Sequence, residues 1–233
     1  MKSIAIMQPT FLPWIGYFAL IDRVDEFVFL DEVQFDKRSW QQRNKIKTPN
    51  GVKWVTIPVL TKGRSSQSIN DVKILYEGKG NPFDKILRTI EINYKKAPYY
   101  QNYLVSLSNI FLSKPGYISD LNQKIIKWVC KELSISTPII RSSDLAVTGN
   151  KDVMLVNICV SRKATSYISP PGSKVYLESS VAFAEKDVRV SYHTYKHPEY
   201  RQLYNNFEPF MCILDLLFNE GPDSTKILQK GNL

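Results

Sequence analysis

The strongest constraint on the fold lies near the N-terminus, where a short apolar run is followed at once by a helical pattern. Residues 3–9, SIAIMQP, end in a proline and are too short for an amphipathic helix, so we expect a buried parallel strand. Residues 14–24 carry apolar side chains at helical spacing, and residues 26–33 form a second apolar run that ends in acids. Strand, helix and strand in this order make a βαβ unit. The unit predicts an α/β protein with a parallel or mostly parallel sheet and flanking helices.

The segment that follows predicts a loop or short helix and then a hairpin. Pro49, Asn50 and Gly51 give a turn signal between two runs that contain β-branched residues. Residues 61–70 are polar, and we expect a loop there. Residues 68–75, SINDVKIL, predict one further strand.

A helical block separates this region from the remaining strands. Residues 82–133 show helical apolar spacing, with Pro98 and Pro115 as breaks between helices. Beyond this block, strands are predicted within 136–145, 165–171 and 187–195, and helices within 151–163 and 209–221. The sequence has no internal repeat, so we expect one α/β domain over residues 1–233, with 82–133 as a helical insertion or subdomain.

Composition and charge exclude several classes of protein. With 233 residues, 43% of them hydrophobic, the chain can form a sizeable core and is not expected to be disordered. No apolar run approaches the roughly 20 residues of a membrane helix, so we expect a cytoplasmic protein without signal peptide or anchor. A net charge of +9 predicts an anionic partner, and nucleic acid, a phosphorylated small molecule or an anionic lipid surface would each satisfy it.

The cysteines and histidines narrow the chemistry. Cys130, Cys159 and Cys212 lie in apolar helical patterns, and we expect them to be reduced core residues. His193 and His197 are four residues apart without further ligand motifs, so no metal site is expected. His197 is a candidate general base, because an amine nucleophile must lose a proton near neutral pH, and a structural histidine is the alternative.

The run QPTFLPWIGYF directly after the first strand is the first candidate binding segment. In open α/β sheets, ligands bind outside the carboxyl ends of the strands, which makes Gln8 and Pro9 candidates for contact. The spacing of Trp14, Gly16 and Tyr17 resembles the H-x-G-H turn of the nucleotidyltransferase superfamily, whose histidines contact nucleotide phosphates. Both histidine positions are aromatic in this chain, which weighs against adenylyl transfer. The rings either wall a pocket for a nucleotide-bearing ligand or pack the first helix on the sheet.

The second candidate segment is DEVQFDKRSWQQRNKIK, which begins at the end of the second strand. Asp31 and Glu32 lie where a catalytic or metal-binding acid would be expected. The planar polar and cationic side chains that follow are Gln34, Arg38, Gln41, Arg43, Asn44 and Lys45. Such groups suit the edges of a base, a sugar or a phosphate, with arginine forks for phosphate oxygens. A solvated face is the alternative.

Two further polar features allow a structural explanation. Asp215 and Asn219 are four residues apart on an otherwise apolar predicted helix, where polar groups cost stability unless they have partners. We interpret them as braces for neighbouring loops, with a role in the site as the alternative. The Pro-Pro-Gly turn before Ser173 could cradle a phosphate, but ordinary turn chemistry explains it equally well.

Four stretches together resemble the WbqC-like family of bacteria: MQPTFLPWIGYFALID, FVFLDEVQFDKRSWQQRNKIKTPNG, SYISPPGSKVYL and HPEYRQLYNNFEPFMCILDLLFNEGP. The resemblance runs from the first residues to about Ser224 and is weak over 82–133. Members of this family tend to occur among genes for O-antigen and other surface polysaccharides, which implies work on a nucleotide-linked sugar. The resemblance also implies an amide-forming role that places glycine or a similar acyl group on an amino sugar.

Residues and resemblance together suggest a transferase or ligase that joins an acyl or aminoacyl group to the amine of a nucleotide-linked amino sugar. In this hypothesis the QPTFLPWIGY turn and the side chains of Arg38, Arg43 and Lys45 hold phosphates. Asp31 or His197 takes the proton of the amine. Gln8, Gln34 and Asn44 orient the sugar.

The sequence leaves three alternatives for the acyl donor: activation by ATP, a thioester, or an aminoacyl-tRNA. One competing hypothesis is a non-catalytic protein that binds a sugar nucleotide or a glycan-assembly partner. The other is a nucleic-acid-binding protein, for which binding should depend steeply on salt.

Overall fold

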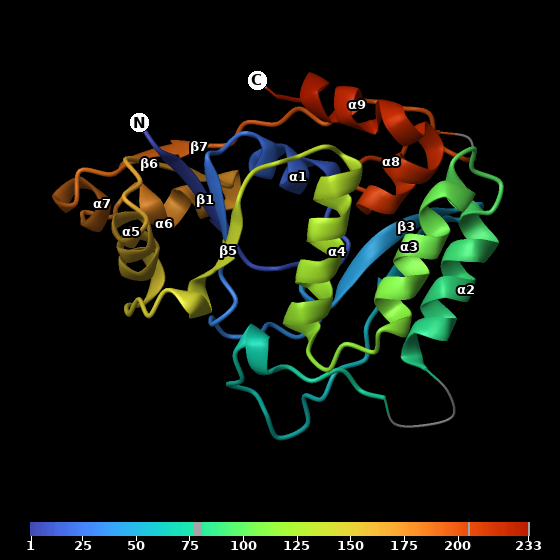
Figure 1. Ribbon diagram of the computed structural model, residues 1–233, viewed down its shortest axis with the longest axis horizontal. Helices are drawn as coiled ribbons and strands as arrows, with labels where there is room; N and C mark the ends of the chain where they lie inside the picture. The colour runs from blue at the N-terminus through green and yellow to red at the C-terminus, as the bar shows by residue number, and fades with distance from the viewer. Residues whose placement is uncertain (77–80, 205, 233) are drawn as a thin grey trace.

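A five-stranded parallel sheet organises the molecule (Figure 1). The computed structural model describes residues 1–76, 81–204 and 206–232. The strands are β1 (Ser3–Met7), β2 (Glu26–Phe29), β5 (Ile139–Arg141), β6 (Ser166–Ser169) and β7 (Arg189–Tyr192). They lie in the order β5-β2-β1-β6-β7, and every neighbouring pair is parallel. The predicted α/β class is therefore confirmed.

Side chains that alternate in direction along the central strands divide the core into two layers. Ala5 and Phe27 belong to one buried cluster, whereas Ile4, Ile6 and Val28 belong to another. Because successive side chains of a strand point to opposite faces, these clusters lie on the two sides of the sheet. The first cluster includes residues of α1 (Ile15–Asp22), α4 (Ile118–Glu132) and α9 (Ser224–Lys230). The second includes residues of α5 (Lys151–Ser161), α6 (Lys174–Leu177) and α7 (Ala182–Glu185).

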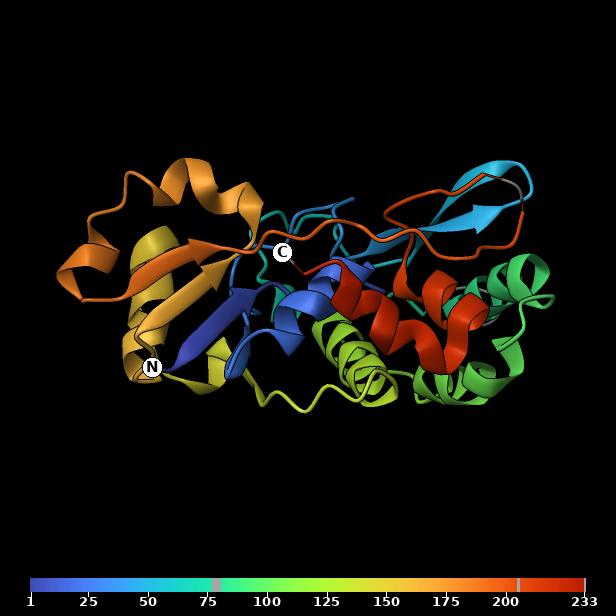
Figure 2. The same cartoon turned by 90° about the horizontal axis from the view of Figure 1, so that it is seen from above.

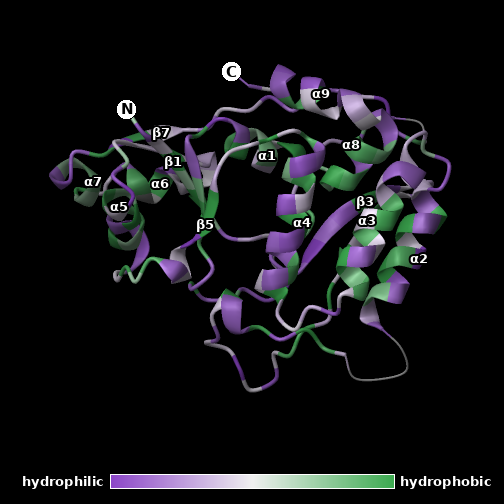
Figure 3. Ribbon diagram, in the orientation of Figure 1, coloured by the Kyte–Doolittle hydropathy of each residue, from purple (hydrophilic) through white to green (hydrophobic). Residues whose placement is uncertain are grey.

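The remaining elements extend the first layer away from the sheet, so the molecule is elongated (Figure 2). They are the antiparallel hairpin β3 (Arg43–Thr48) and β4 (Gly51–Thr56), with α2 (Pro82–Tyr94), α3 (Tyr100–Leu112) and α8 (Ile213–Glu220). The hairpin turn is at the predicted place. Its strand β3 is largely hydrophilic, in contrast to β5 (Figure 3). Among the described residues, no helix is long and apolar enough to cross a bilayer.

The predicted helix breaks are confirmed, since α2 ends before Pro98 and α3 ends before Pro115. The helix α8 stops at Gly221, as predicted. This residue has φ +51°, and a Cβ atom here would lie 2.5 Å from the ring of Tyr99. Glycine is therefore required at this helix end.

The strand predicted at 68–75 is wrong. Ile69–Asp71 is a 3₁₀ turn, and only isolated bridges occur around it. Ser68 Oγ donates to the side chains of Asn70 and Asp71. Short polar side chains that bond locally compete with the ladder of a sheet, and here they favour the turn. The short helices α6, α7 and α9 were not predicted as separate elements.

Candidate functional site

A large opening lies at the carboxyl edge of the sheet. The chain runs from β1 through β2 to β5 on one side of β1, and then from β6 to β7 on the other. In such a doubly wound sheet, the connections leave opposite faces where the strand order reverses, which opens a crevice there. A cavity of about 1320 Å³ occupies this position, lined from β1, from β6, and from loops within 30–41 and 147–151.

A pair of amides forms one wall of the cavity. Gln41 Nε2 donates to Gln8 Oε1 over 2.8 Å, and Gln41 Oε1 accepts from the backbone N–H of Asp36. Asn122 Nδ2 donates to the backbone oxygens of Pro9 and Gln41, at 3.0 and 2.8 Å. Both amides are thus held in one orientation, and within the described contacts the Nε2 group of Gln8 and the second N–H of Gln41 Nε2 are left as donors for a ligand.

The two acids after β2 have different roles. Asp31 is fully buried and does not line the cavity. Its Oδ2 accepts from Arg141 Nε at 2.7 Å and from Ser143 Oγ at 3.1 Å, while its Oδ1 accepts from Ser142 Oγ at 3.3 Å. These contacts tie the end of β2 to the segment after β5. Glu32 lines the cavity instead, and its buried Oε1 has no hydrogen-bond partner among the described residues.

The start of α5 forms the opposite wall, which sequence reasoning missed. Residues 147–151 line the cavity, and Lys151 is the cation among the described lining residues. Gly149 has φ +136°, and a Cβ atom at this position would lie 2.9 Å from the backbone N of Met154. Gly149, two residues before the predicted helix, was the sequence signal for this turn, because a side chain at this position would clash with the backbone.

The turn after β6 closes a third side. Ser173 lines the cavity, donates to the backbone oxygen of Pro170 at 2.7 Å and bonds the hydroxyl of Ser169. The Pro-Pro-Gly turn is therefore braced from within by its own serine.

The aromatic residues of the first turn pack within the fold. Tyr17 is buried and donates its hydroxyl to the backbone oxygen of Gln8 at 3.0 Å, and burial raises its pKa well above the usual value. A Cβ atom on Gly16 would lie 2.2 Å from the ring of Trp14, so this glycine lets the indole fold over α1. Neither Trp14, Gly16 nor Tyr17 lines the cavity within the described residues.

His197 lies in an aromatic cluster. Its ring stacks on Trp14, with centroids 5.9 Å apart, and meets Phe207 and Phe210 edge-on. Its Nδ1 lies 2.9 Å from the backbone oxygen of Pro198, and burial lowers its pKa. Nothing in this arrangement brings the imidazole to the cavity wall.

Asp215 is the centre of a second buried network. Its Oδ1 accepts from Tyr94 at 2.9 Å, and its Oδ2 accepts from Tyr200 at 2.9 Å and from Gln202 Nε2 at 2.7 Å. Lys47 Nζ in turn donates to Gln202 Oε1 at 3.0 Å. Burial raises the pKa of Asp215, while these hydrogen bonds oppose the shift. The network joins α8, α2, β3 and the segment before α8, as expected of a brace.

The remaining predicted ligand residues are distributed over the loop and hairpin. Gln34 lines the cavity and donates to the backbone oxygen of Ser65 at 3.0 Å. Asn44 is buried and donates to the backbone oxygen of Leu12 at 2.7 Å, so it supports the first turn. Arg38 is exposed.

Arg43 and Lys45 lie on the hairpin beside two exposed indoles, one of which, Trp40, also lines the cavity. Of the predicted binding residues, the structure thus brings Gln8, Gln34 and Gln41 to the cavity. Lys45 lies next to it, with its Nζ 5.8 Å from the ring centroid of Trp40, and Arg43 packs on Trp54.

The three cysteines lie in the core and do not line the cavity. Cys130, Cys159 and Cys212 are free and buried, and burial raises the pKa of each thiol to about 12. They are core residues, as predicted. Within the described part of the chain, no group of three potential metal ligands lies together.

The fold and cavity define a doubly wound α/β protein with an opening where this class binds ligands. The sequence profile of the WbqC-like protein family matches residues 8–227, and the chain belongs to this family. It is also 38% identical over 232 residues to "Uncharacterized protein Rv1507c" of Mycobacterium tuberculosis, with 98% of each chain covered. No solved structure matches the chain.

Proposed function

We propose that the protein is a transferase or ligase that joins an acyl or aminoacyl group, such as glycine, to the amine of a nucleotide-linked amino sugar for surface polysaccharide such as O-antigen. The observation that carries the proposal is the cavity at the strand-order reversal, whose lining includes the amides of Gln8, Gln34 and Gln41 and the carboxylate of Glu32. Its volume of about 1320 Å³ exceeds the roughly 1,000 Å³ upper range of common ligand pockets, which suits a sugar nucleotide.

In the proposed reaction, the amine nitrogen attacks the carbonyl carbon of an activated acyl group. The new C–N bond forms, the bond from carbon to the leaving group breaks, and the amine loses one proton. The leaving group departs as a thiolate, as AMP after activation with ATP, or as the hydroxyl of a tRNA. The donor is thus an activated acyl compound, and the acceptor is the sugar amine.

We assign the proton-accepting role to Glu32 and not to Asp31 or His197. Glu32 lines the cavity, and its buried Oε1 has no hydrogen-bond partner among the described residues. Asp31 is occupied by Arg141 and the neighbouring serines, and His197 is enclosed by aromatic rings. A general base contributes about 10²- to 10⁴-fold to a rate, so this group should affect turnover far more than binding.

The test combines TDP-, UDP- and GDP-linked amino sugars with thioester, aminoacyl-tRNA, or glycine and ATP, and detects the acylated product by mass. We expect one combination to give product, and Glu32→Gln to lower its rate about 100-fold with unchanged affinity for the sugar nucleotide. Gln34→Ala is the matched lining variant and should weaken affinity more than rate. Sugar-nucleotide binding without product from any donor would contradict the proposal.

A non-catalytic sugar-nucleotide-binding protein is the second candidate. It is supported because two of the three candidate proton acceptors do not line the cavity. Asp31 is bonded to Arg141 and His197 is stacked on Trp14, so Glu32 is the carboxylate that remains in the described cavity lining. If the protein only binds the sugar nucleotide, neither the wild type nor Glu32→Gln would form product, and both would bind with the same affinity. The same assay therefore separates the two functions.

A further inference from the structure

The rim of the cavity carries an exposed aromatic surface that the proposed chemistry has not used. Trp40 and Trp54 have ring centroids 5.2 Å apart at an interplanar angle of 41°. They are 48% and 40% exposed, although large aromatic side chains are normally buried. On the hairpin, Trp54 is the direct cross-strand partner of Lys45. We call Trp40, Trp54, Arg43 and Lys45 the tryptophan platform.

The two cations of the platform are held against the rings. The guanidinium carbon of Arg43 lies 4.3 Å from the ring centroid of Trp54, and Lys45 Nζ lies 5.3 Å from the same centroid. Such cation–π contacts position a charge without neutralising it. Neither cation has a carboxylate partner among the described residues, whereas Arg141 and Arg162 are both in ion pairs. The platform therefore combines two flat apolar rings with two positive charges that lack a counter-charge.

The platform is continuous with the cavity. Trp40 belongs to both, because its side chain lines the cavity and contacts Trp54. Its backbone oxygen accepts from the N–H of Phe11 at 2.8 Å, which fixes it to the turn after β1. Gln41, the next residue, pairs with Gln8 in the cavity wall. A ligand that is flat and anionic at one end could therefore lie on the platform and extend its other end into the cavity.

We propose that the tryptophan platform is the nucleotide subsite of the proposed sugar-nucleotide site, an inference that rests on the proposed function. The nucleobase stacks on the indoles of Trp40 and Trp54, the diphosphate pairs with Arg43 and Lys45, and the amino sugar extends into the cavity toward Glu32. Stacking on aromatic side chains accepts any base, so the platform binds the nucleoside diphosphate and leaves the choice of sugar to the cavity. Arginine suits the phosphate oxygens because its planar fork can make paired hydrogen bonds.

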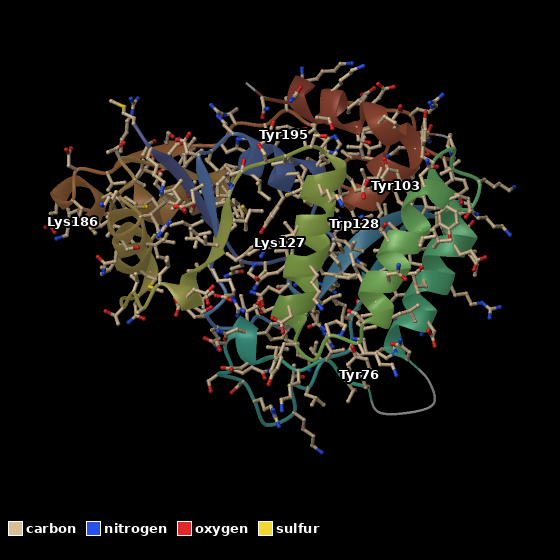
Figure 4. The ribbon with its side chains drawn as sticks, in the orientation of Figure 1. Tyr76, Tyr103, Lys127, Trp128, Lys186 and Tyr195 are labelled. Carbon is tan, nitrogen blue, oxygen red and sulfur yellow. The ribbon has the colours of Figure 1, made fainter. Side chains whose placement is uncertain are left out.

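The test measures dissociation constants by calorimetry for the free nucleoside diphosphates and for the sugar nucleotide that gives product. We expect Trp54→Ala and Arg43→Ala each to weaken both ligands about 10- to 100-fold, in line with the cost of removing a stacking side chain. Lys186→Ala removes a charge at the opposite end of the molecule from the hairpin (Figure 4) and should leave both constants unchanged. Circular dichroism and thermal melting verify that each variant is folded.

Two of three further outcomes would overturn the inference, and the remaining one would reject only the transferase. Unchanged nucleotide affinity in folded Trp54→Ala and Arg43→Ala would place the nucleotide elsewhere, while product formation and its loss in Glu32→Gln would leave the proposed function intact. Nucleotide binding that needs the platform, but without product from any donor, would instead support the subsite and reject the transferase. Preferred binding of a single-stranded oligonucleotide, with a steep loss of affinity as salt rises, would make the platform a nucleic-acid surface.

Discussion

The cavity and the C-terminal segment 193–220 each contain a carboxylate with a buried oxygen, and the two carboxylates differ in their hydrogen bonds. Asp215, in the C-terminal segment, accepts hydrogen bonds from two tyrosines and a glutamine. Glu32, in the cavity wall, has a buried oxygen without a partner among the described residues. A carboxylate whose oxygens all accept hydrogen bonds supports the fold, whereas a buried carboxylate oxygen without a partner costs stability unless a ligand or water donates to it. The difference separates a bracing region from a binding region, and four predictions test it.

The largest effect is expected for Asp215→Ala. The change leaves the hydroxyls of Tyr94 and Tyr200 and the amide of Gln202 buried without their acceptor. We expect the free energy of unfolding to fall by about 3–5 kcal/mol, because several buried donors lose their bonds at once. Urea unfolding measures the change. Asp223→Ala, at an exposed position near the same end of the chain, is the control and should change stability by less than about 0.5 kcal/mol. A similarly small loss for Asp215→Ala would mean that the network does not brace α8.

The second prediction concerns acid and the histidines of the C-terminal segment. Burial, and then Arg23 with its guanidinium 3.5 Å from the imidazole, lowers the pKa of His193 from 6.5 to about 4. Below pH 6.5, the imidazole of His193 therefore binds a proton in the unfolded chain but stays neutral in the folded chain. The free energy of unfolding thus decreases as pH falls from 6.5 toward 4. The expected loss is about 2–3 kcal/mol from this residue.

Urea unfolding at several pH values measures the acid effect. His193→Gln should flatten the loss between pH 6.5 and 4, although His197, whose pKa burial also lowers, retains part of it. Lys186→Ala serves as a control and should keep the wild-type profile. An unchanged slope in His193→Gln would show that the imidazole titrates normally in the folded protein.

The third prediction uses the carboxylate beside Glu32. Asp31→Asn keeps the shape of the side chain but removes the charge that pairs with Arg141 at 2.7 Å. We expect a loss of about 2 kcal/mol in unfolding free energy, as for a hydrogen bond to a charged group, with ligand affinity changed less than about threefold. A large loss of affinity without loss of stability would move Asp31 from the bracing to the binding class.

Regular periodicity made most of the fold predictable from the sequence. The βαβ unit, the hairpin turn and the helix breaks at prolines depend on local patterns of apolar, proline and glycine residues. The strand at 68–75 failed because side-chain hydrogen bonds from Ser68 favour a local turn over pairing with a strand. Local apolar patterns contain no information about such competition.

The candidate site was less predictable, because neighbouring residues in the chain can face different surroundings. Asp31 and Glu32 are equivalent acids in the sequence, and only the strand order shows that one meets Arg141 and the other the cavity. Lys151 is far from the first turn in the chain, and the doubly wound topology brings it to the same opening. The contact between the exposed rings of Trp40 and Trp54 likewise joins a loop to the hairpin in three dimensions. Tertiary arrangement therefore decided which of several chemically suitable residues belong to the site.

The smallest stability effect is expected for Glu32→Gln, the counterpart of Asp31→Asn one residue earlier. Because the buried Oε1 of Glu32 has no hydrogen-bond partner among the described residues, its replacement by an amide removes no bond that the folded protein makes there. We expect the unfolding free energy to stay the same or to rise in urea unfolding without ligand, because the amide removes a charge that the fold does not satisfy, while turnover falls about 100-fold. A loss of more than about 2 kcal/mol would show that Glu32 is bonded like Asp215, and the contrast between a bracing and a binding carboxylate would then fail.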